Sequence, residues 1–257
     1  MVISGFDTRL DAFQRWQESP WGRLRYILTE ANLLRHLDEE PQRVLDVAGG
    51  NGLDAVRLAA RGHEVTVLDP AGAMLRDAKE HAEALDVGDR LHVVQATAED
   101  APELFAADSF DVVLCHNLLQ YVEDRRAVLR AVLAPLRPDG LLSVLAPNAD
   151  SDALRTAIRG LDPRRALREL DSDTSYVDLL DMVLPACTAG ETIGQLAELG
   201  IGLITRYGVR CVCDYIADDE IKQDPRFFAE LERLELALSD RMPYLLTARF
   251  FHLIARR

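Results

Sequence analysis

Short apolar runs alternate with helical segments through the middle of the chain. The predicted strands are Arg43–Ala48, His63–Asp69, Arg90–Gln95, Ser109–Cys115 and Leu141–Ala146, and the predicted helices between them are Leu53–Ala60, a segment from Pro70 to about Leu85, and Asp124–Leu136. This alternation is typical of right-handed βαβ units in an open parallel sheet, the α/β class. Ligands of such sheets sit beyond the carboxyl ends of the strands, so functional residues are expected just after strands one to four.

The segments on either side of this core have different patterns. Two helices are predicted before it, at residues 7–18 and 22–38, with Gly22 opening the second. After it, helical stretches broken by Gly160 and Pro163 predict an inserted helical cap rather than a separate domain. The remaining predicted elements are a helix at Gly190–Leu199, a long strand region at Gly202–Tyr215, an acidic amphipathic helix at Pro225–Leu238, and a closing strand at Thr247–Arg256, antiparallel to its neighbour.

The composition of the chain also indicates where in the cell the protein is expected. No apolar run approaches the roughly 20 residues needed to span a bilayer, and Met1–Leu10 lacks the apolar centre of a signal peptide. The four cysteines are too few and too scattered for a disulfide framework. We therefore expect a cytoplasmic protein without a membrane partner.

The formal net charge is −14. A chain this acidic does not attract polyanions through its overall field, which argues against general nucleic-acid binding. A local basic island is nevertheless present, formed by Arg155, Arg159, Arg164, Arg165 and Arg168. An arginine-rich cap could close over either a nucleic acid or a small molecule.

The first predicted strand runs into a glycine-rich turn with the sequence VLDVAGGNG, residues 44–52. Glycines let a ligand approach the backbone closely and permit unusual backbone dihedrals. Asp46 stands at the strand tip, where a buried carboxylate can order the loop or receive a cationic group of a ligand. The alternative is a plain strand-to-helix turn, which three glycines in four positions disfavour.

Polar residues also follow the next three strands. Asp69 closes the second strand, where a carboxylate can accept two hydrogen bonds from a ribose diol; capping of the turn before Pro70 is the alternative. Ala98 and Glu99 follow the third strand, where a backbone N–H and a side-chain acceptor suit the edge of an adenine, although Glu99 alone would be a solvated loop acid. His116 follows the fourth strand at the ligand-facing end, as a site residue or a structural one.

The C-terminal part carries a candidate anion pocket. Arg210 and Arg249 offer planar forks suited to a carboxylate or phosphate, and Tyr215 and Tyr244 can stack on a base or donate a hydrogen bond. In the alternative, both arginines pair with Asp214 and the acidic segment 218–235.

Two cysteines raise the question of a metal site. Cys211 and Cys213 are predicted to lie on one face of a strand, without a second ligand pair at zinc spacing. They are therefore expected to be packing residues, and no metal is predicted.

An ordered set of motifs resembles the class I S-adenosylmethionine-dependent methyltransferases. The set is VLDVAGGNG (44–52), VLDP (67–70), ATAED (96–100), SFDVVLCHNLLQYVED (109–124) and LRPDGLLSVL (136–145). The resemblance implies a Rossmann-like, doubly wound, seven-stranded sheet whose last strand is antiparallel. It implies one domain over 1–257, made of N-terminal helices (1–40), a cofactor-binding core (41–149), the helical cap (150–200), and C-terminal strands with the acidic helix (201–257).

The same resemblance implies S-adenosylmethionine as the cofactor. The residues expected to bind it are Asp46, Ala48, Gly49, Gly50, Asp69, Ala98, Glu99 and His116. One departure is Ala48, which stands where the family usually has its first glycine. Its extra methyl group either crowds the methionine part of the cofactor or is tolerated.

A closer resemblance reaches beyond the core, to the bacterial tRNA carboxymethoxyuridine methyltransferases, which methylate the carboxylate of a modified wobble uridine. It rests on Gly22-Arg23-Leu24-Arg25, Gly208-Val209-Arg210 with Asp214-Tyr215, and Pro243-Tyr244 with Arg249 and His252. By this resemblance Arg25 would hold the carboxylate of the cofactor. Residues 151–200 match poorly, and substrate choice usually resides there.

The acceptor therefore stays open between a modified tRNA and an anionic small metabolite. A carboxylate acceptor is already a nucleophile at neutral pH, whereas a hydroxyl or amine needs a base within hydrogen-bond reach. The candidate bases are His116, Asp214 and His252.

Two other functions compete with methyl transfer. Residues 50–55 fit the G-x-G-x-x-G/A fingerprint of a nicotinamide-dependent oxidoreductase, with Asp69 at 19 residues after Gly50. Ala48 is the one hint of a non-catalytic binding protein on the same fold. The sequence predicts no oligomeric state.

Overall fold

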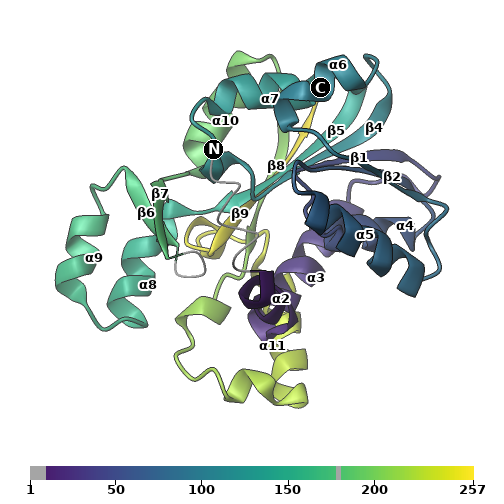
Figure 1. The fold of residues 1–257 in the computed structure, drawn as a ribbon. Helices are drawn as coiled ribbons and strands as arrows, with labels where there is room; N and C mark the ends of the chain where they lie inside the picture. Colours follow the sequence, from purple (N-terminus) through teal and green to yellow (C-terminus); the bar gives the residue numbers. More distant parts are fainter. Residues whose placement is uncertain (1–9, 178–180) are drawn as a thin grey trace.

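The computed structural model describes residues 10–177 and 181–257. Its centre is a seven-stranded sheet in the order β3-β2-β1-β4-β5-β9-β8 (Figure 1). The strands are β1 (Arg43–Val47), β2 (Glu64–Leu68), β3 (Leu91–Val94), β4 (Phe110–His116), β5 (Leu136–Pro147), β8 (Gly202–Val209) and β9 (Phe250–Arg256). The first five pair in parallel, and β9 runs antiparallel to both β5 and β8. The predicted α/β fold with an antiparallel last strand is confirmed.

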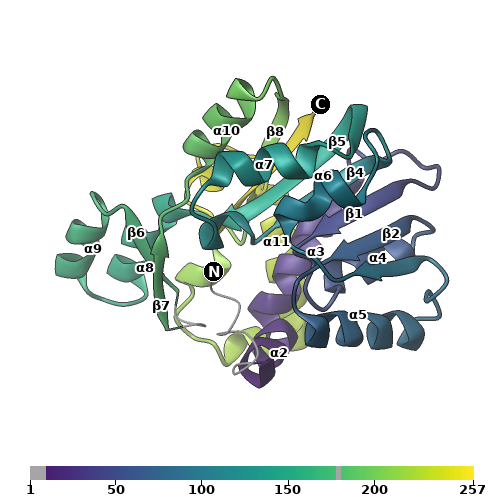
Figure 2. The ribbon, with the colours of Figure 1, turned by 45° about the horizontal axis from the view of Figure 1, so that its top comes forward.

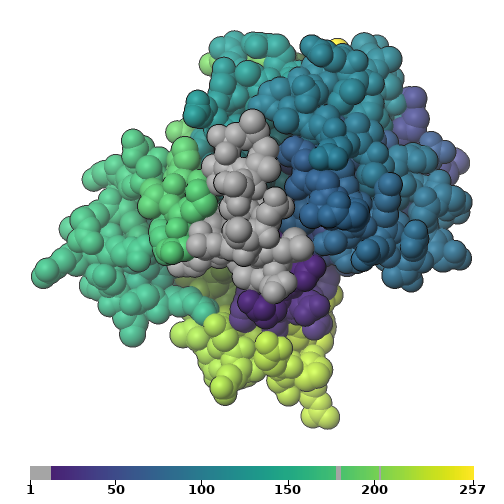
Figure 3. All heavy atoms as spheres, in the orientation of Figure 1, coloured from purple at the N-terminus to yellow at the C-terminus, as the bar shows by residue number. Residues whose placement is uncertain are grey.

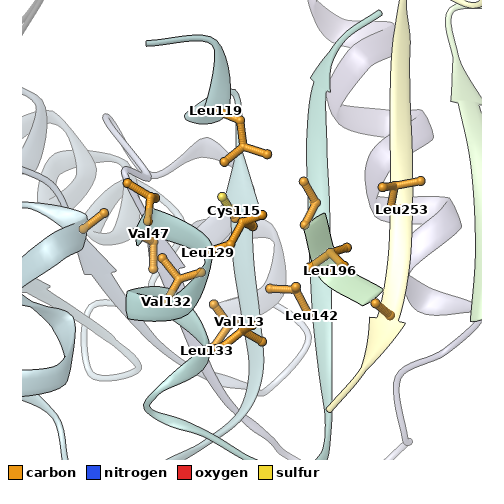
Figure 4. Close-up of a cluster of buried hydrophobic side chains, with 14 of the residues drawn as sticks. Val47, Val113, Cys115, Leu119, Leu129, Val132, Leu133, Leu142, Leu196 and Leu253 are labelled. Carbon is orange, nitrogen blue, oxygen red and sulfur yellow. The ribbon is translucent and has the colours of Figure 1, made fainter. Parts of the chain in front are cut away.

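Helices cover both faces of this sheet (Figures 1 and 2). One face carries α3 (Pro20–Leu34), α4 (Leu53–Ala59) and α5 (Gly72–Ala84), and the other carries α6 (Ala101–Leu104), α7 (Arg125–Leu133) and α10 (Ala189–Glu198). Figure 4 shows the second layer, where Val113, Leu142 and Leu253 of the sheet face Leu129 of α7 and Leu196 of α10. Because both faces are covered, the central strands read as continuous apolar runs.

The N-terminal helices differ from their predicted bounds. Residues 7–9 of the first predicted helix lie outside the described residues, and the helix α2 covers Leu10–Glu18. The second helix begins at Pro20, not at Gly22, because Ser19 caps it by accepting a hydrogen bond from Gly22 N. Gly22 has a different use: a Cβ there would lie 2.0 Å from the carbonyl oxygen of Trp16, so only glycine permits this helix-to-helix contact.

The cap is not wholly helical, contrary to the prediction. It contains α8 (Asp152–Ile158) and α9 (Pro163–Glu169), followed by an antiparallel pair of strands, β6 (Thr174–Val177) and β7 (Met182–Pro185). The β-branched and aromatic residues in these short runs favour strands over helices. Residues 178–180 of the predicted cap lie outside the described residues. The cap stands to one side of the sheet (Figures 1 and 3).

The long strand predicted to reach Tyr215 ends at Val209. Arg210 has a left-handed backbone (φ 64°), and Cys213–Tyr215 form a single 3-10 turn. Glu235 of α11 (Pro225–Leu238) takes the place of a partner strand, because its carboxylate accepts hydrogen bonds from the N–H groups of Cys211, Val212 and Cys213 at 2.5, 3.0 and 2.7 Å. The two cysteines therefore do not share a strand face.

The closing strand also starts later than predicted, at Phe250 rather than Thr247.

All four cysteines are free and buried, as packing residues are. Within residues 10–177 and 181–257, no group of three His, Cys, Asp or Glu side chains could hold a metal ion, and no helix is long and apolar enough to cross a membrane.

Candidate active site

A cavity of about 770 Å³ lies beyond the carboxyl ends of the central strands. Its walls come from the loops that follow β1, β2, β3 and β4, from α2 and α3, and from the cap and the C-terminal segment. The predicted site residues that line it are Arg25, Asp46, Ala48, Gly49, Gly50, Asp69, Ala98, Glu99, His116, Arg210, Asp214 and Arg249. Tyr215, Tyr244 and His252 are not among its lining residues.

The loop after β1 is shaped by three left-handed residues, Ala48 (φ 56°), Gly50 (φ 56°) and Gly52 (φ 71°). Gly49, between the first two, packs so closely that a Cβ would lie 2.6 Å from the carboxyl carbon of Asp46. The space beside Gly50 is open, since a Cβ there would meet no atom within 4 Å. The loop thus presents bare backbone to the cavity.

Two carboxylates flank this loop. Asp69 accepts hydrogen bonds from Gly50 N at 2.9 Å and from Ala71 N at 2.8 Å, so it caps its own turn and also holds the glycine loop. Asp46 is buried, and its Oδ2 is without a hydrogen-bond partner among the described residues. Burial, with the neighbouring charge of Asp54, raises the pKa of Asp46 well above its usual range. This unpartnered oxygen is a ready acceptor for a cationic ligand group.

Asp54, in the first turn of α4, joins two other site residues. Its carboxylate lies 2.5 Å from Arg25 Nη1 and 3.1 Å from His116 Nδ1. Burial opposes ionisation of Asp54, but Arg25 and His116 together hold its pKa below the usual range. Burial lowers the pKa of His116, which favours the neutral ring at pH 7. Nothing in the local pattern singles out Asp54 beyond its place two residues after Gly52.

Several further lining residues were missed by the sequence reasoning. They are Phe13, Trp16, Trp21, Tyr26, Asn51, Met74 and Tyr121. Apart from Asn51, their aromatic and apolar surfaces suit the flat face of a base or purine. Phe13 and Trp16 are neighbours on α2, but the whole set comes from several helices and loops, so no single spacing rule marks it.

The cap and the C-terminal segment line the other end of the cavity with positive charge. The lining cations there are Arg155, Arg159, Arg210, Lys222 and Arg249, against two carboxylates, Asp214 and Asp219. The end near the glycine loop has the opposite balance: among the described lining residues, Arg25 is the cation there, against Asp46, Asp54, Asp69 and Glu99. The cavity is therefore acidic at one end and basic at the other.

The two predicted anion-binding arginines have different surroundings. Arg210 is engaged by Asp214, which accepts from its Nε at 2.7 Å and from its Nη2, so this arginine follows the ion-pair alternative. Arg249 Nη1 is 3.8 Å from Asp152. Burial and the neighbouring Arg155 lower the pKa of Arg249 to about 10, so it stays charged at neutral pH.

Three predicted residues do not line the cavity, and Asp214, which does, is already paired. Tyr215 donates its hydroxyl to Thr247 O at 2.5 Å, which ties the 3-10 turn to the segment before β9. Tyr244 is about half exposed. His252 is fully buried in β9, where its Nε2 lies 2.8 Å from Ser143 Oγ. Asp214 is committed to Arg210, which lowers its pKa against the effect of burial.

Comparison with known proteins gives a consistent picture. The sequence profile of the methyltransferase domain matches residues 44–140. The chain is 29% identical to the tRNA 5-carboxymethoxyuridine methyltransferase of Escherichia coli K12, over 96% of this chain and 95% of that protein. It is 34% identical to the ubiquinone biosynthesis O-methyltransferase of Haemophilus ducreyi, over 54% of this chain and 58% of that one.

Solved structures share the fold at low sequence identity. A possible histamine N-methyltransferase from Thermotoga maritima has a TM-score of 0.66 at 15% identity, covering 100% of this chain and 99% of that one. A Burkholderia thailandensis 1,6-didemethyltoxoflavin N1-methyltransferase with bound S-adenosylhomocysteine has a TM-score of 0.60 at 17% identity, covering 98% and 84%.

Proposed function

We propose, from the premise that this chain belongs to the S-adenosylmethionine-dependent methyltransferases, that it methylates a carboxylate oxygen of an anionic acceptor. The acceptor that we favour is the carboxymethoxy group of a modified tRNA wobble uridine. The observation that carries the proposal is the division of charge in the cavity, where the acidic end suits a sulfonium cofactor and the basic end suits an anion.

The acidic end has the donors and acceptors that S-adenosylmethionine needs. Asp69 would hold the ribose hydroxyls, and Ala98 and Glu99 the adenine edge. Asp46, with its unpartnered Oδ2, would receive the ammonium group of the cofactor, and Arg25 its carboxylate. The bound cofactor supplies a methyl group on a positive sulfur, which an aligned nucleophile can displace.

The state of the candidate bases favours a carboxylate acceptor. Both ring nitrogens of His116 lie within hydrogen-bond distance of other side chains, Asp54 and Ser143. His252 does not line the cavity, and Asp214 is paired with Arg210. A carboxylate needs no proton removed before it attacks, so this site can work without a general base.

Arg249 is the residue to which we assign the acceptor carboxylate. It is charged, buried, and at 3.8 Å only loosely paired with Asp152. The planar guanidinium of Arg249 can hold one oxygen of the carboxylate by hydrogen bonds while the other oxygen attacks the methyl group. Arg155 adds positive charge beside it, which further favours an anionic acceptor.

The tRNA assignment is supported by the relative that aligns over nearly the whole chain, cap and C-terminal segment included. An anionic small metabolite is the second candidate, favoured by the net charge of −14, which disfavours a polyanion. Both candidates make the same product group, a methyl ester.

One experiment separates these outcomes. The protein is incubated with methyl-labelled S-adenosylmethionine and either total tRNA or a small-molecule extract, and the product is then treated with mild alkali. We expect label in tRNA that alkali releases as methanol, because esters hydrolyse and methyl ethers or amines do not. Label in the small-molecule pool would select the metabolite, and alkali-stable label would overturn carboxylate methylation.

A further inference from the structure

A row of hydrogen bonds leads from the cavity into the middle of the sheet. It runs from Arg25 to Asp54 (2.5 Å), from Asp54 to His116 (3.1 Å), from His116 to Ser143 (2.8 Å) and from Ser143 to His252 (2.8 Å). Arg25, Asp54 and His116 line the cavity, whereas Ser143 and His252 are fully buried behind it. We call this row the Arg25–His252 relay.

The proton positions along the relay follow from what each atom can do. The Asp54 carboxylate is ionised beside Arg25 and can only accept, so the proton of neutral His116 sits on Nδ1. His116 Nε2 is then an acceptor, and the Ser143 hydroxyl must donate to it. Ser143 Oγ in turn accepts from the Nε2–H of His252.

The far end of the relay agrees with this order of protons. It leaves Nδ1 of His252 as a bare acceptor, and that atom has no hydrogen-bond partner among the described residues. A buried unpaired acceptor is better tolerated than a buried unpaired N–H. From Asp54 to Nε2 of His252 every contact in the row pairs a donor with an acceptor, so each ring can take only one orientation. At the cavity end, Nε of Arg25 has no hydrogen-bond partner among the described residues.

We propose that Ser143 and His252 are positioning residues for cofactor binding, which act through His116 and Asp54 to fix the guanidinium of Arg25 against the carboxylate of S-adenosylmethionine. Asp54 is the ion-pair partner of Arg25 among the described residues, and Arg25 otherwise lies over the ring of Tyr26 at 4.5 Å. If His116 can turn, Asp54 loses one of the two groups that hold it, and Arg25 loses its fixed direction.

This role predicts a selective loss of affinity. The adenosine half of the cofactor is assigned to Asp69, Ala98 and Glu99, none of which belongs to the relay. The affinity for a ligand that lacks the amino-acid carboxylate should therefore not change when the relay is altered. The inference rests on the cofactor site and not on the identity of the acceptor, so it can fail while the proposed methylation stands.

The test measures dissociation constants by calorimetry for two ligands, S-adenosylhomocysteine and 5′-methylthioadenosine, which lacks the carboxylate. For Ser143→Ala and His252→Leu we expect binding of S-adenosylhomocysteine to weaken about tenfold, as for loss of one charge-assisted contact, with no change for 5′-methylthioadenosine. His252→Gln should retain tight binding, because its amide N–H can reach the Ser143 oxygen. Equal weakening for both ligands, or none for either, would overturn the proposal.

A second measurement needs no variant and so survives a failure of any variant to fold. Nitrogen-15 NMR of the histidine rings in the unsubstituted protein reports which ring nitrogen carries the proton. We expect His116 to be neutral with the proton on Nδ1, and His252 to be neutral with the proton on Nε2. If His116 carries its proton on Nε2, or is charged at pH 7, Ser143 cannot donate to it, and the inference is wrong.

Discussion

The carboxylate of Asp69 accepts a hydrogen bond from the backbone N–H of Gly50 at 2.9 Å, so the end of β2 fixes the loop that follows β1. Its other oxygen accepts from Ala71 N at 2.8 Å. Each carboxylate oxygen has two acceptor sites, so both oxygens can still receive a ribose hydroxyl. The structural and the binding interpretation of Asp69 are therefore compatible.

Replacing Asp69 should weaken cofactor binding. For Asp69→Ala we expect a loss of about 1–3 kcal/mol in the binding free energy of S-adenosylhomocysteine, the usual size for a lost charge-assisted hydrogen bond. Calorimetric titration measures it, with Asp240→Ala as the control, since Asp240 is an exposed partner of Arg35. Unchanged affinity in a folded Asp69→Ala protein would reject the ribose role.

Ala48 adopts a backbone that suits glycine better (φ 56°). A left-handed conformation costs an L-residue about 1–2 kcal/mol, which glycine would avoid. The greater flexibility of glycine in the unfolded chain offsets about 0.5–1 kcal/mol of this stabilisation. We therefore expect Ala48→Gly to raise the free energy of unfolding slightly or leave it unchanged, and to keep cofactor affinity. Denaturant titration measures the stability.

The matched control for this substitution is Asp139→Gly, at an exposed left-handed residue (φ 60°) within β5, outside the cavity lining. A similar gain in both proteins would show that backbone strain is the cause. A stabilised Ala48→Gly that binds S-adenosylhomocysteine more tightly would show that the alanine methyl crowds the ligand. Clear destabilisation would contradict the strain argument.

The sequence predicted the parts of the site that depend on local rules. The glycine loop and Asp69 were found because parallel strands bring their carboxyl ends to one edge. The relay could not be found, because Asp54, His116, Ser143 and His252 are 62, 27 and 109 residues apart. Their meeting depends on the order of β4, β5 and β9 in the sheet, which a strand pattern alone does not settle.

The end of β8 was also predicted wrongly, because it depends on a hydrogen-bond acceptor that is distant in the sequence. The strand predicted through Tyr215 ends at Val209 because Glu235, more than 20 residues later in the chain, accepts hydrogen bonds from the N–H groups of Cys211, Val212 and Cys213. By contrast, the ion pair of Arg210 with Asp214 joins residues four apart, and such a local contact can be predicted from the sequence.

Arg249 should matter for the acceptor and not for the cofactor. For Arg249→Ala we expect kcat/KM for the acceptor to fall about 10- to 100-fold, as for a lost hydrogen bond to a charged group. The affinity for S-adenosylhomocysteine should stay the same, because Arg249 lies in the basic half of the cavity. Arg233→Ala, at an exposed residue paired with Glu230, is the control. Equal losses of acceptor use and cofactor affinity would indicate a structural role instead.

The buried histidine of β9 should make folding depend on pH. Burial, with the repulsion that a protonated His116 would exert and with the nearby charge of Arg25, holds the pKa of His252 well below its usual value of 6.5. As the pH falls below about 6.5, His252 binds a proton in the unfolded chain but not in the folded protein. Because of this difference, the free energy of unfolding falls by up to about 1.4 kcal/mol per pH unit. The full contribution of His252 to stability is present above pH 6.5.

His252→Gln removes this titration and keeps the donor to Ser143. We therefore expect the stability advantage of the unsubstituted protein over His252→Gln, measured by urea unfolding, to shrink steadily from pH 7 to pH 5. Asp46, whose pKa is raised, acts in the opposite direction as the pH changes, but it is present in both proteins and cancels in their difference. A difference that does not change between pH 7 and pH 5 would mean that His252 titrates alike in the folded and unfolded chains, and that its burial does not keep it neutral.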